Sequence, residues 1–259
     1  MKRPIFLFLS ILTFQISFGQ NAEELNQQSK ELVQQGKYNE VLPLLKKSAE
    51  LGNPEAQYNY GYFLQSGTAG IKNEHEAVKW YEKSSENGFN DGHYAMMMAY
   101  GNGQGIEQSA KKAFKYALKC ANNNDATCMW NVVNCYLTGN GVKADTNKFK
   151  EWIIKLAKLP NPENLALSGN ITSARLELAN SYKNGEYFEK DNYQSYLWYL
   201  IYNESKVDFS ILKQQEVIKE IKEIEKKLSK TQLENAKKDA EKLLGRELNS
   251  TSELYKDSL

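Results

Sequence analysis

The sequence is poor in the residues that most often build catalytic and metal centres. Its 259 residues contain only three cysteines and two histidines. His75 and His93 lie in no cluster with the spacing of zinc ligands, and neither accompanies a serine or cysteine in a recognisable nucleophile motif. We therefore predict a protein without metal, cofactor or catalytic activity, and we expect both histidines at the surface.

An excess of charge of one sign is also missing. The chain carries 33 basic and 32 acidic residues, which leaves a formal net charge of +1. Because binding to nucleic acid or to an anionic membrane usually requires a basic surface, this balance gives no support to either partner.

Long apolar runs are absent beyond the first residues. Lys2 and Arg3 precede an apolar stretch from Ile5 to Phe14, and Ser17 and Gly19 are small residues before a cleavage site. This order is typical of a secretory signal peptide over residues 1–19, and the apolar stretch is too short for a comfortable membrane span. We expect an exported bacterial protein, periplasmic or secreted, with no membrane insertion once the signal is removed.

The few cysteines leave two interpretations open. Cys128 and Cys135 are seven residues apart on one expected helix, a rise of about 10 Å, which is too far for a disulfide. Cys120 ends one expected helix and Cys128 begins the next, so these two either form a disulfide in an oxidising compartment or pack as small thiols.

What the sequence does contain is a repeat. Ala56, Gly92, Cys128 and Ala174 occupy equivalent positions, separated by 36, 36 and 46 residues, and the last interval includes an insertion over Asn161–Asn170. A fixed period of this length is typical of a stack of helix pairs. The sequence therefore predicts an all-α solenoid.

Helix boundary signals follow the same period. Eleven residues after each anchor stands a glycine, suited to end a helix in the left-handed conformation: Gly67, Gly103, Gly139 and Gly185. The second helix of each pair begins after a residue that caps helices well: Asn73, Ser109, Asp145 and Asp191. Aromatic residues recur on these second helices, at Trp80, Tyr116, Trp152 and Trp198.

These positions, together with Gly103-Gln-Gly-Ile106, Gly139-Asn-Gly-Val142 and Lys79-Trp80-Tyr81, resemble the Sel1-like repeat family, a relative of the tetratricopeptide repeats. The resemblance implies a right-handed α/α solenoid of antiparallel helix pairs over residues 20–204. It departs from the family pattern where Met97, Val133 and Ala179 replace the glycine found at Gly61. Residues 205–259 lack the period, and we expect them to form a helical hairpin that caps the stack, followed by a frayed tail.

The resemblance also implies a role as adaptor or scaffold for a protein or peptide partner. At 100° per residue, the positions three, six and ten residues after each anchor lie opposite the packed side of the first helix. We expect them to align as a concave binding face, on which Asn59, Tyr62, Met98, Asn131, Asn134, Glu177 and Asn180 contact an extended polypeptide. The remaining members of these rows are Ser66, Ala95, Asn102, Thr138 and Asn184.

The competing interpretation is an envelope hydrolase that acts on cell-wall material. Export and distant analogy support it, but no catalytic group of residues does. The sequence does not name the partner or give the oligomeric state.

Overall fold

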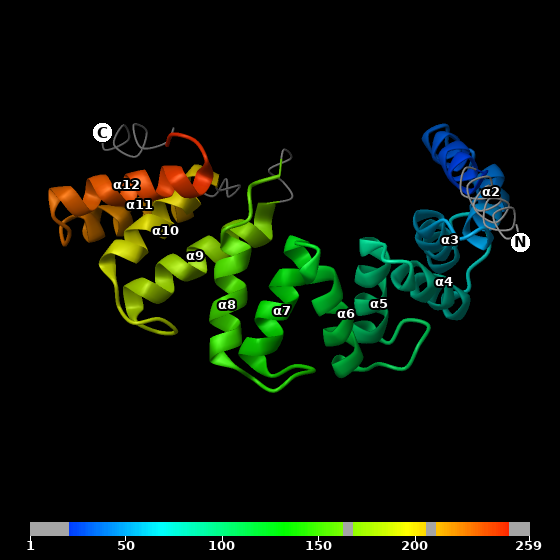
Figure 1. The fold of residues 1–259 in the computed structure, drawn as a ribbon, viewed down its shortest axis with the longest axis horizontal. Helices are drawn as coiled ribbons and strands as arrows, with labels where there is room; N and C mark the ends of the chain where they lie inside the picture. The colour runs from blue at the N-terminus through cyan, green and yellow to red at the C-terminus, as the bar shows by residue number, and fades with distance from the viewer. Residues whose placement is uncertain (1–20, 163–167, 206–210, 249–259) are drawn as a thin grey trace, which may run out of the picture. The chain divides into compact units, whose positions relative to one another are not determined.

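The computed structural model describes residues 21–162, 168–205 and 211–248, and every regular element in these ranges is a helix (Figure 1). A helix over residues 21–34 comes first. It is followed by α2 (Tyr38–Glu50), α3 (Pro54–Ser66), α4 (Glu74–Glu86), α5 (Asn90–Asn102), α6 (Ala110–Asn122), α7 (Ala126–Thr138), α8 (Thr146–Ala157), α9 (Gly169–Asn184), α10 (Asn192–Ser205), α11 (Ile211–Glu225) and α12 (Lys230–Leu244). The predicted all-α class is confirmed, whereas the predicted signal peptide over residues 1–19 and the predicted tail from residue 249 lie outside the described residues.

The chain divides into two compact units. Unit 1 runs to Asn123 and includes Asn140–Val142, and unit 2 comprises Asn124–Gly139 and the chain from Lys143 onwards. Within unit 1 each helix from α2 to α6 packs against the next, and within unit 2 the same holds from α7 to α10. This nearest-neighbour packing is typical of repeat proteins, in which a single helix pair cannot bury its apolar face alone.

The turn signals work as predicted. Gly67, Gly103, Gly139 and Gly185 end their helices with φ between 72° and 80°. The side chain of Asn73 accepts a hydrogen bond from the backbone of Glu76 at 3.1 Å, and Ser109, Asp145 and Asp191 cap their helices in the same way. Each helix pair therefore begins and ends where the repeat places its capping residues.

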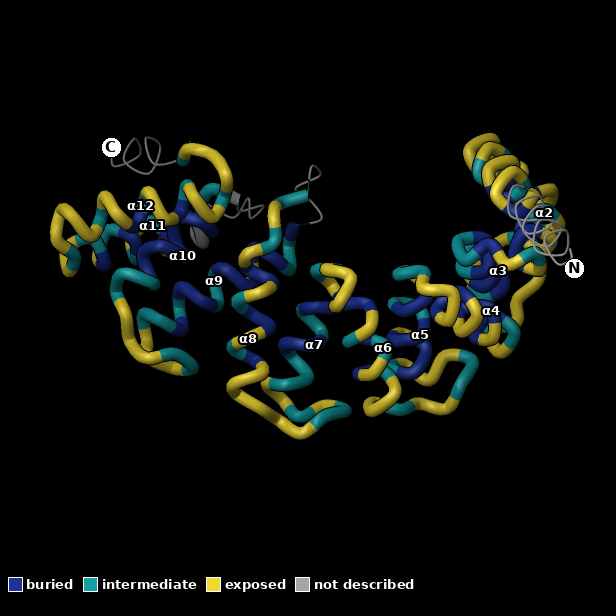
Figure 2. Tube along the Cα trace, in the orientation of Figure 1, coloured by how far each residue is buried: buried dark blue, intermediate teal, exposed yellow. Residues whose placement is uncertain are grey.

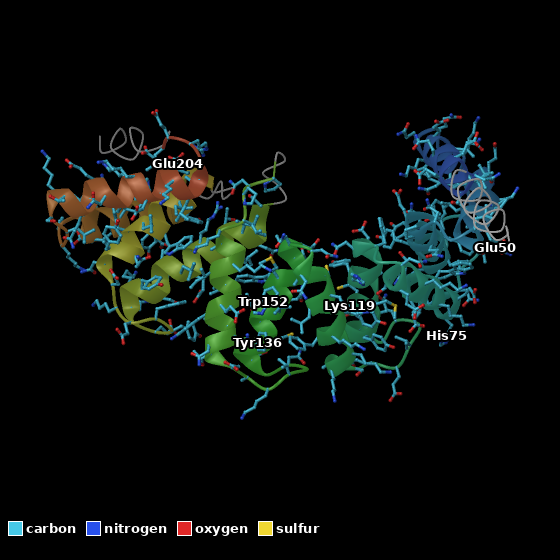
Figure 3. The ribbon with its side chains drawn as sticks, in the orientation of Figure 1. Glu50, His75, Lys119, Tyr136, Trp152 and Glu204 are labelled. Carbon is cyan, nitrogen blue, oxygen red and sulfur yellow. The ribbon has the colours of Figure 1, made fainter. Side chains whose placement is uncertain are left out.

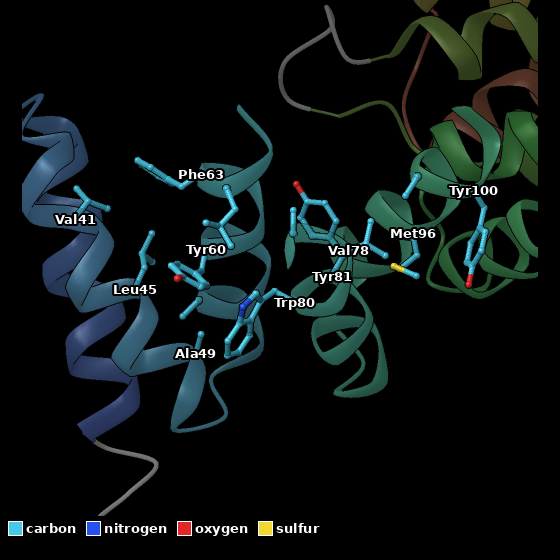
Figure 4. Packing of buried hydrophobic residues seen from close by; sticks show 14 residues of the cluster. Val41, Leu45, Ala49, Tyr60, Phe63, Val78, Trp80, Tyr81, Met96 and Tyr100 are labelled. Atoms are coloured by element: carbon cyan, nitrogen blue, oxygen red, sulfur yellow. The ribbon is translucent and has the colours of Figure 1, made fainter. Parts of the chain in front are cut away.

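The core of unit 1 fills the space between α2, α3, α4 and α5 (Figure 4). Tyr60 and Trp80 meet edge to face, with ring centroids 5.3 Å apart. Gly61 allows the ring of Tyr81 to lie against the backbone of α3, because a Cβ at residue 61 would come within 2.7 Å of that ring. The anchor residue Ala56 is fully buried, as the repeat predicts.

Unit 2 has its own core. Phe149, Trp152 and Ile153 of α8 are buried, and so are Tyr196 to Tyr202 of α10. α10 contacts both α11 and α12, and the Ser229 side chain caps α12 through a capping box with Gln232. Figure 2 shows buried and exposed segments alternating along the helices of both units, as expected for helices that each pack one face.

Cys120 and Cys128 are disulfide-bonded, which decides between the two interpretations that the sequence left open. Cys135 is a free, half-buried thiol, and burial raises its pKa.

Candidate functional site

In unit 1, the predicted binding face lies on α3 and α5, which contact each other. Tyr62 on α3 is 51% exposed and Met98 on α5 is 38% exposed, whereas Asn59 is half-buried. Ser66 and Asn102 are exposed, and Ala95 is half-buried. Two large side chains of the predicted set thus present apolar surface to solvent on neighbouring first helices.

Tyr58 and Tyr94 belong to the same face, although they are not among the residues predicted from the sequence. Tyr58 is half-buried, with its ring 5.8 Å from that of Tyr81 and 5.9 Å from that of Phe89. Burial raises the pKa of the Tyr58 hydroxyl, and the nearby Asp91, Tyr62 and Tyr94 raise it further. The face of unit 1 is therefore an aromatic cluster rather than a polar strip.

Helix geometry explains the omission. Packed positions of the first helix lie between 0° and 80°, so the opposite side is centred near 220°. The residue two positions after the anchor lies at about 200°, closer to that centre than the positions at about 300° and 280° that were selected. Applied to each repeat, this rule gives Tyr58, Tyr94, Trp130 and Leu176, all half-buried.

In unit 2, the predicted residues lie on α7 and α9, which also contact each other. Asn131, Asn134, Glu177 and Asn180 are all half-buried. Asn131 donates from Nδ2 to the carbonyl of Thr127 at 2.9 Å, and Asn134 donates to the carbonyl of its own helix at Trp130 at 3.0 Å. Each bond uses one of the two N–H groups of an amide that also has an acceptor oxygen.

Asn180 and Glu177 make contacts within unit 2. The hydroxyl of the buried Tyr199 donates to Asn180 Oδ1 at 2.7 Å, and Ser181 Oγ donates to Glu177 Oε1 at 3.3 Å. Asn180 is thus part of the internal packing, and its replacement would leave a buried hydroxyl without this acceptor.

The surface position expected for His93 is wrong, whereas His75 is exposed. His93 is 7% exposed, and its Nδ1 lies 2.6 Å from Ser85 Oγ, which is itself buried. Burial lowers the pKa of the His93 imidazole, and Lys119 lowers it further. His93 is buried because it follows Gly92, which brings the start of α5 against Ser84 and Ser85 at the end of α4. With both side chains buried, this serine–histidine pair is a packing contact between α4 and α5.

Among the described residues, no helix combines the length and the apolarity that a membrane span requires.

Comparison with known proteins identifies the repeat. The family model described as Sel1 repeat matches residues 54–89, 92–125, 127–161 and 172–201, together just over half of the chain. The chain is 25% identical to a Sel1 repeat protein from Oxalobacter formigenes of known crystal structure, with a TM-score of 0.58 over 77% of this chain and 76% of that one. A protective antigen of uropathogenic Escherichia coli with the same kind of repeat is also 25% identical, with a TM-score of 0.42 over 84% of this chain and 50% of that one.

A curated relative comes from a plant. The ERAD-associated E3 ubiquitin-protein ligase component HRD3B of Arabidopsis thaliana is 32% identical over 112 residues, which are 42% of this chain. The match spans only 17% of the length of that protein. With four matched repeats and a similar solved fold, the chain belongs to the Sel1 repeat family, whose members are generally protein-interaction scaffolds.

Proposed function

We propose that the protein is a non-enzymatic scaffold of the bacterial cell envelope. We propose further that it binds a polypeptide partner on the first-helix face, which is the predicted binding face on the exposed side of the first helix of each pair. The observation that carries the proposal is the solvent exposure of Tyr62 and Met98 on the neighbouring helices α3 and α5. Family membership supports a protein partner in general, and this exposed apolar surface supports the choice of face.

The chemistry of the face suits an extended peptide. Tyrosine offers a large apolar ring with a polar end, and such side chains are frequent at interface positions that contribute strongly to affinity. Methionine adapts its shape to different partners. In unit 2, Asn131 and Asn134 add amide groups that bind backbone N–H and carbonyl groups equally well. We therefore expect the face of unit 1 to contact apolar side chains of a partner and the face of unit 2, by itself, to contact polypeptide backbone.

The proposed location rests on residues 1–19 alone. A short basic start, an apolar stretch and small residues at Ser17 and Gly19 are together typical of a cleaved signal peptide. N-terminal sequencing of the exported protein should begin at Gln20. A protein that retains Met1 and stays in the cytoplasm would contradict this location.

The binding face is tested with a double variant, Tyr62→Ser and Met98→Ser, and a matched control, Ile71→Ser. Ile71 is 56% exposed and precedes α4, so its replacement removes a similar exposed apolar group away from the face. A partner captured from envelope extract by the parent protein and then purified should bind the double variant about tenfold or more weakly. It should bind the control as tightly as the parent.

The asparagines need a separate variant that leaves the packing intact. Asn131→Ala with Asn134→Ala removes side chains bonded to their own helix backbone, whereas Asn180 is left in place for Tyr199. Weaker binding by this folded variant supports a contribution of α7 in unit 2 to partner binding. If both face variants bind like the parent while a variant with exposed residues replaced on the second helices binds more weakly, the assignment of the binding face to the first helices is wrong.

The hydrolase alternative is tested with the same preparations. Purified protein incubated with cell-wall fragments should release no soluble sugar or peptide. Release that persists in the double variant and depends on enzyme concentration would replace the scaffold proposal with an enzymatic one.

A further inference from the structure

A pocket in unit 2 lies apart from the first-helix face, between the loop after α8 and the C-terminal end of α12. It encloses about 420 Å³, within the range of roughly 300–1,000 Å³ that is usual for small-ligand sites. Lys158, Arg175 and Arg246 line it, together with the single carboxylate of Glu204. The lining is therefore positively charged in a protein whose overall charge is nearly balanced.

Arg175 is a buried cation of this pocket, with only 2% of its surface exposed. Its Nε donates to the carbonyl of Ala157 at 2.9 Å, its Nη2 to the carbonyl of Leu159 at 2.8 Å, and its Nη1 to Asn161 Oδ1 at 2.6 Å. These three acceptors carry no formal charge. The guanidinium has five N–H groups, so these bonds hold its orientation without neutralising its charge.

Arg246 brings a second positive charge close to the first. Burial lowers the pKa of Arg175 to about 10, and the charge of Arg246 contributes to the shift. Arg175 is still protonated at pH 7. Arg246 Nη1 lies 2.9 Å from Glu204 Oε2, whose side chain is 2% exposed and lies beside the C-terminal end of α12 (Figure 3). Glu204 offsets one of the two arginine charges, so one positive charge of the arginine pair, besides that of the exposed Lys158, is left for an anionic ligand.

The rest of the pocket wall is apolar. Leu159 and Leu244 are half-buried, and Leu243 is 42% exposed although it belongs to the end of a packed helix. A purely inorganic anion would leave this apolar surface in contact with water. A ligand with both a charged group and an aliphatic group would cover the arginines and the leucines together.

We propose that this pocket binds an organic carboxylate with a short aliphatic group, the carboxylate held by Arg175 and Arg246 and the aliphatic group packed on Leu159, Leu243 and Leu244. A planar carboxylate matches the fork of a guanidinium group, which makes such pairs short and specific. Two sources have this chemistry: a free carboxylic acid and the C-terminal carboxylate of a polypeptide that ends in an aliphatic residue.

The test is titration calorimetry on the full chain with defined probes. These are 4-methylpentanoate, the peptide acetyl-Ala-Ala-Leu with a free carboxylate, the same peptide as its C-terminal amide, and inorganic phosphate. The two carboxylates should bind, and the amide and phosphate should bind about tenfold or more weakly. Tighter binding of the peptide than of the small acid indicates a polypeptide terminus as the source, and equal binding indicates a free acid. Binding of the amide or of phosphate as tight as that of the carboxylates, or no carboxylate binding at all, overturns the proposal.

Variants locate the site. Arg246→Gln combined with Glu204→Gln removes a charge pair together, which avoids a lone buried carboxylate, and should weaken carboxylate binding about tenfold or more. Leu243→Asn changes an exposed side chain, so it keeps the fold and should also weaken binding. The matched control is Lys238→Gln, an exposed cation on α12 outside the pocket. Unchanged binding in both folded pocket variants would contradict the site.

The double variant Tyr62→Ser and Met98→Ser separates this proposal from the proposed function. It should bind the carboxylate like the parent, so the two proposals fail or hold independently.

Discussion

The two units join successive helix pairs in different ways. In unit 1, α4 meets α5 through small residues, since a Cβ on Gly92 would lie 2.6 Å from Ser84 Oγ and 2.7 Å from the backbone nitrogen of Ser85. In unit 2, α8 is separated from α9 by an insertion, and the long side chain of Arg175 reaches back to the carbonyls of Ala157 and Leu159. One junction relies on the absence of side-chain atoms and the other on a single charged side chain.

The difference shows what an insertion requires. Where the period is regular, the backbone of one pair packs closely on the next, and one neutral amide is enough at the junction of α2 and α3, where Gln57 Nε2 donates to the carbonyl of Ala49 at 3.1 Å. Where extra residues separate the pairs, carbonyls at the end of α8 need other donors, because buried polar groups without hydrogen bonds are costly. Arg175 supplies these donors to the carbonyls of Ala157 and Leu159.

The largest loss of stability is expected from changes in the aromatic cores, because each unit has a buried tryptophan in its own core. Trp80 in unit 1 is 6% exposed and Trp152 in unit 2 is 8% exposed, and a lysine one turn later lies over each ring. Replacement of either tryptophan by alanine should lower the free energy of unfolding by about 3–5 kcal/mol, the usual cost of removing a buried large aromatic. Chemical denaturation measures this loss.

Hydrogen exchange distinguishes the two tryptophan variants. Trp152→Ala should accelerate exchange most in α7, α8 and α9, and Trp80→Ala most in α3, α4 and α5, because each helix contacts mainly its neighbours in the stack. Changes limited to the mutated residue, or the same map for both variants, would contradict stability that is distributed repeat by repeat.

The next largest effect is expected from the arginine of unit 2. Arg175→Met keeps a long side chain but removes all three donated hydrogen bonds, and should cost about 2–3 kcal/mol because hydrogen bonds from a charged group are among the stronger ones. Arg175→Lys should recover only part of this loss, since an ammonium group lacks the planar fork. If Arg175→Met is as stable as the parent in a denaturant titration, the hydrogen bonds from Arg175 to the insertion are not needed for stability.

The small-residue junction of unit 1 offers a matched pair on one helix. Gly92→Ala should destabilise the protein by about 1–3 kcal/mol through overpacking, because the added Cβ meets the end of α4. Gly101→Ala lies near the end of the same helix with nothing within 4 Å, so it should stabilise by about 0.5–1 kcal/mol through the lower backbone entropy of the unfolded chain. Melting temperatures that shift in the same direction would contradict a junction built on close approach.

The regular features could be predicted from the sequence because they depend on local chemistry. The period placed the buried anchors Ala56 and Cys128, the glycines that end the first helices and the residues that cap the second ones, and the structure confirms these positions. Each depends on a residue type at a fixed distance along the chain. The exposed side chains Tyr62 and Met98 were found in the same way, by helical spacing alone.

The features that were missed depend on tertiary contacts. Nothing in the local sequence shows that Arg175 of α9 would reach residues 157–161, because the insertion interrupts the period there. His93 was expected at the surface, but its burial follows from the close approach at Gly92. Tyr58 and Tyr94 were missed because they lie at a helical angle of about 200°, nearer the centre of the exposed side than the predicted positions at about 280° and 300°. The partner itself cannot be predicted from the residues of one chain.

The smallest effect is expected from pH, and it should act on one unit only, because both histidines of the sequence, His75 and His93, belong to unit 1. Burial and then Lys119 hold the pKa of folded His93 below its ordinary value of 6.5. Above pH 6.5 the imidazole is neutral in both the folded and the unfolded chain, so its neutral contact with Ser85 is fully retained. As the pH falls below 6.5, the unfolded chain takes up the proton while the folded chain resists it, and stability is lost.

His93→Gln tests this pH dependence, since it keeps a polar side chain near Ser85 but cannot titrate. Between pH 7.5 and 5.5 the melting temperature of the parent should fall more than that of the variant, and exchange in α4 and α5 should accelerate in the parent while α9 and α10 change little. Carboxylates that titrate at lower pH are common to both proteins, so they cancel in the difference. His75→Gln is the matched control, because it replaces the exposed histidine of the same unit. If the parent and His93→Gln lose stability equally, the acid sensitivity belongs to other groups, and the two units differ in their junctions without differing in their response to pH.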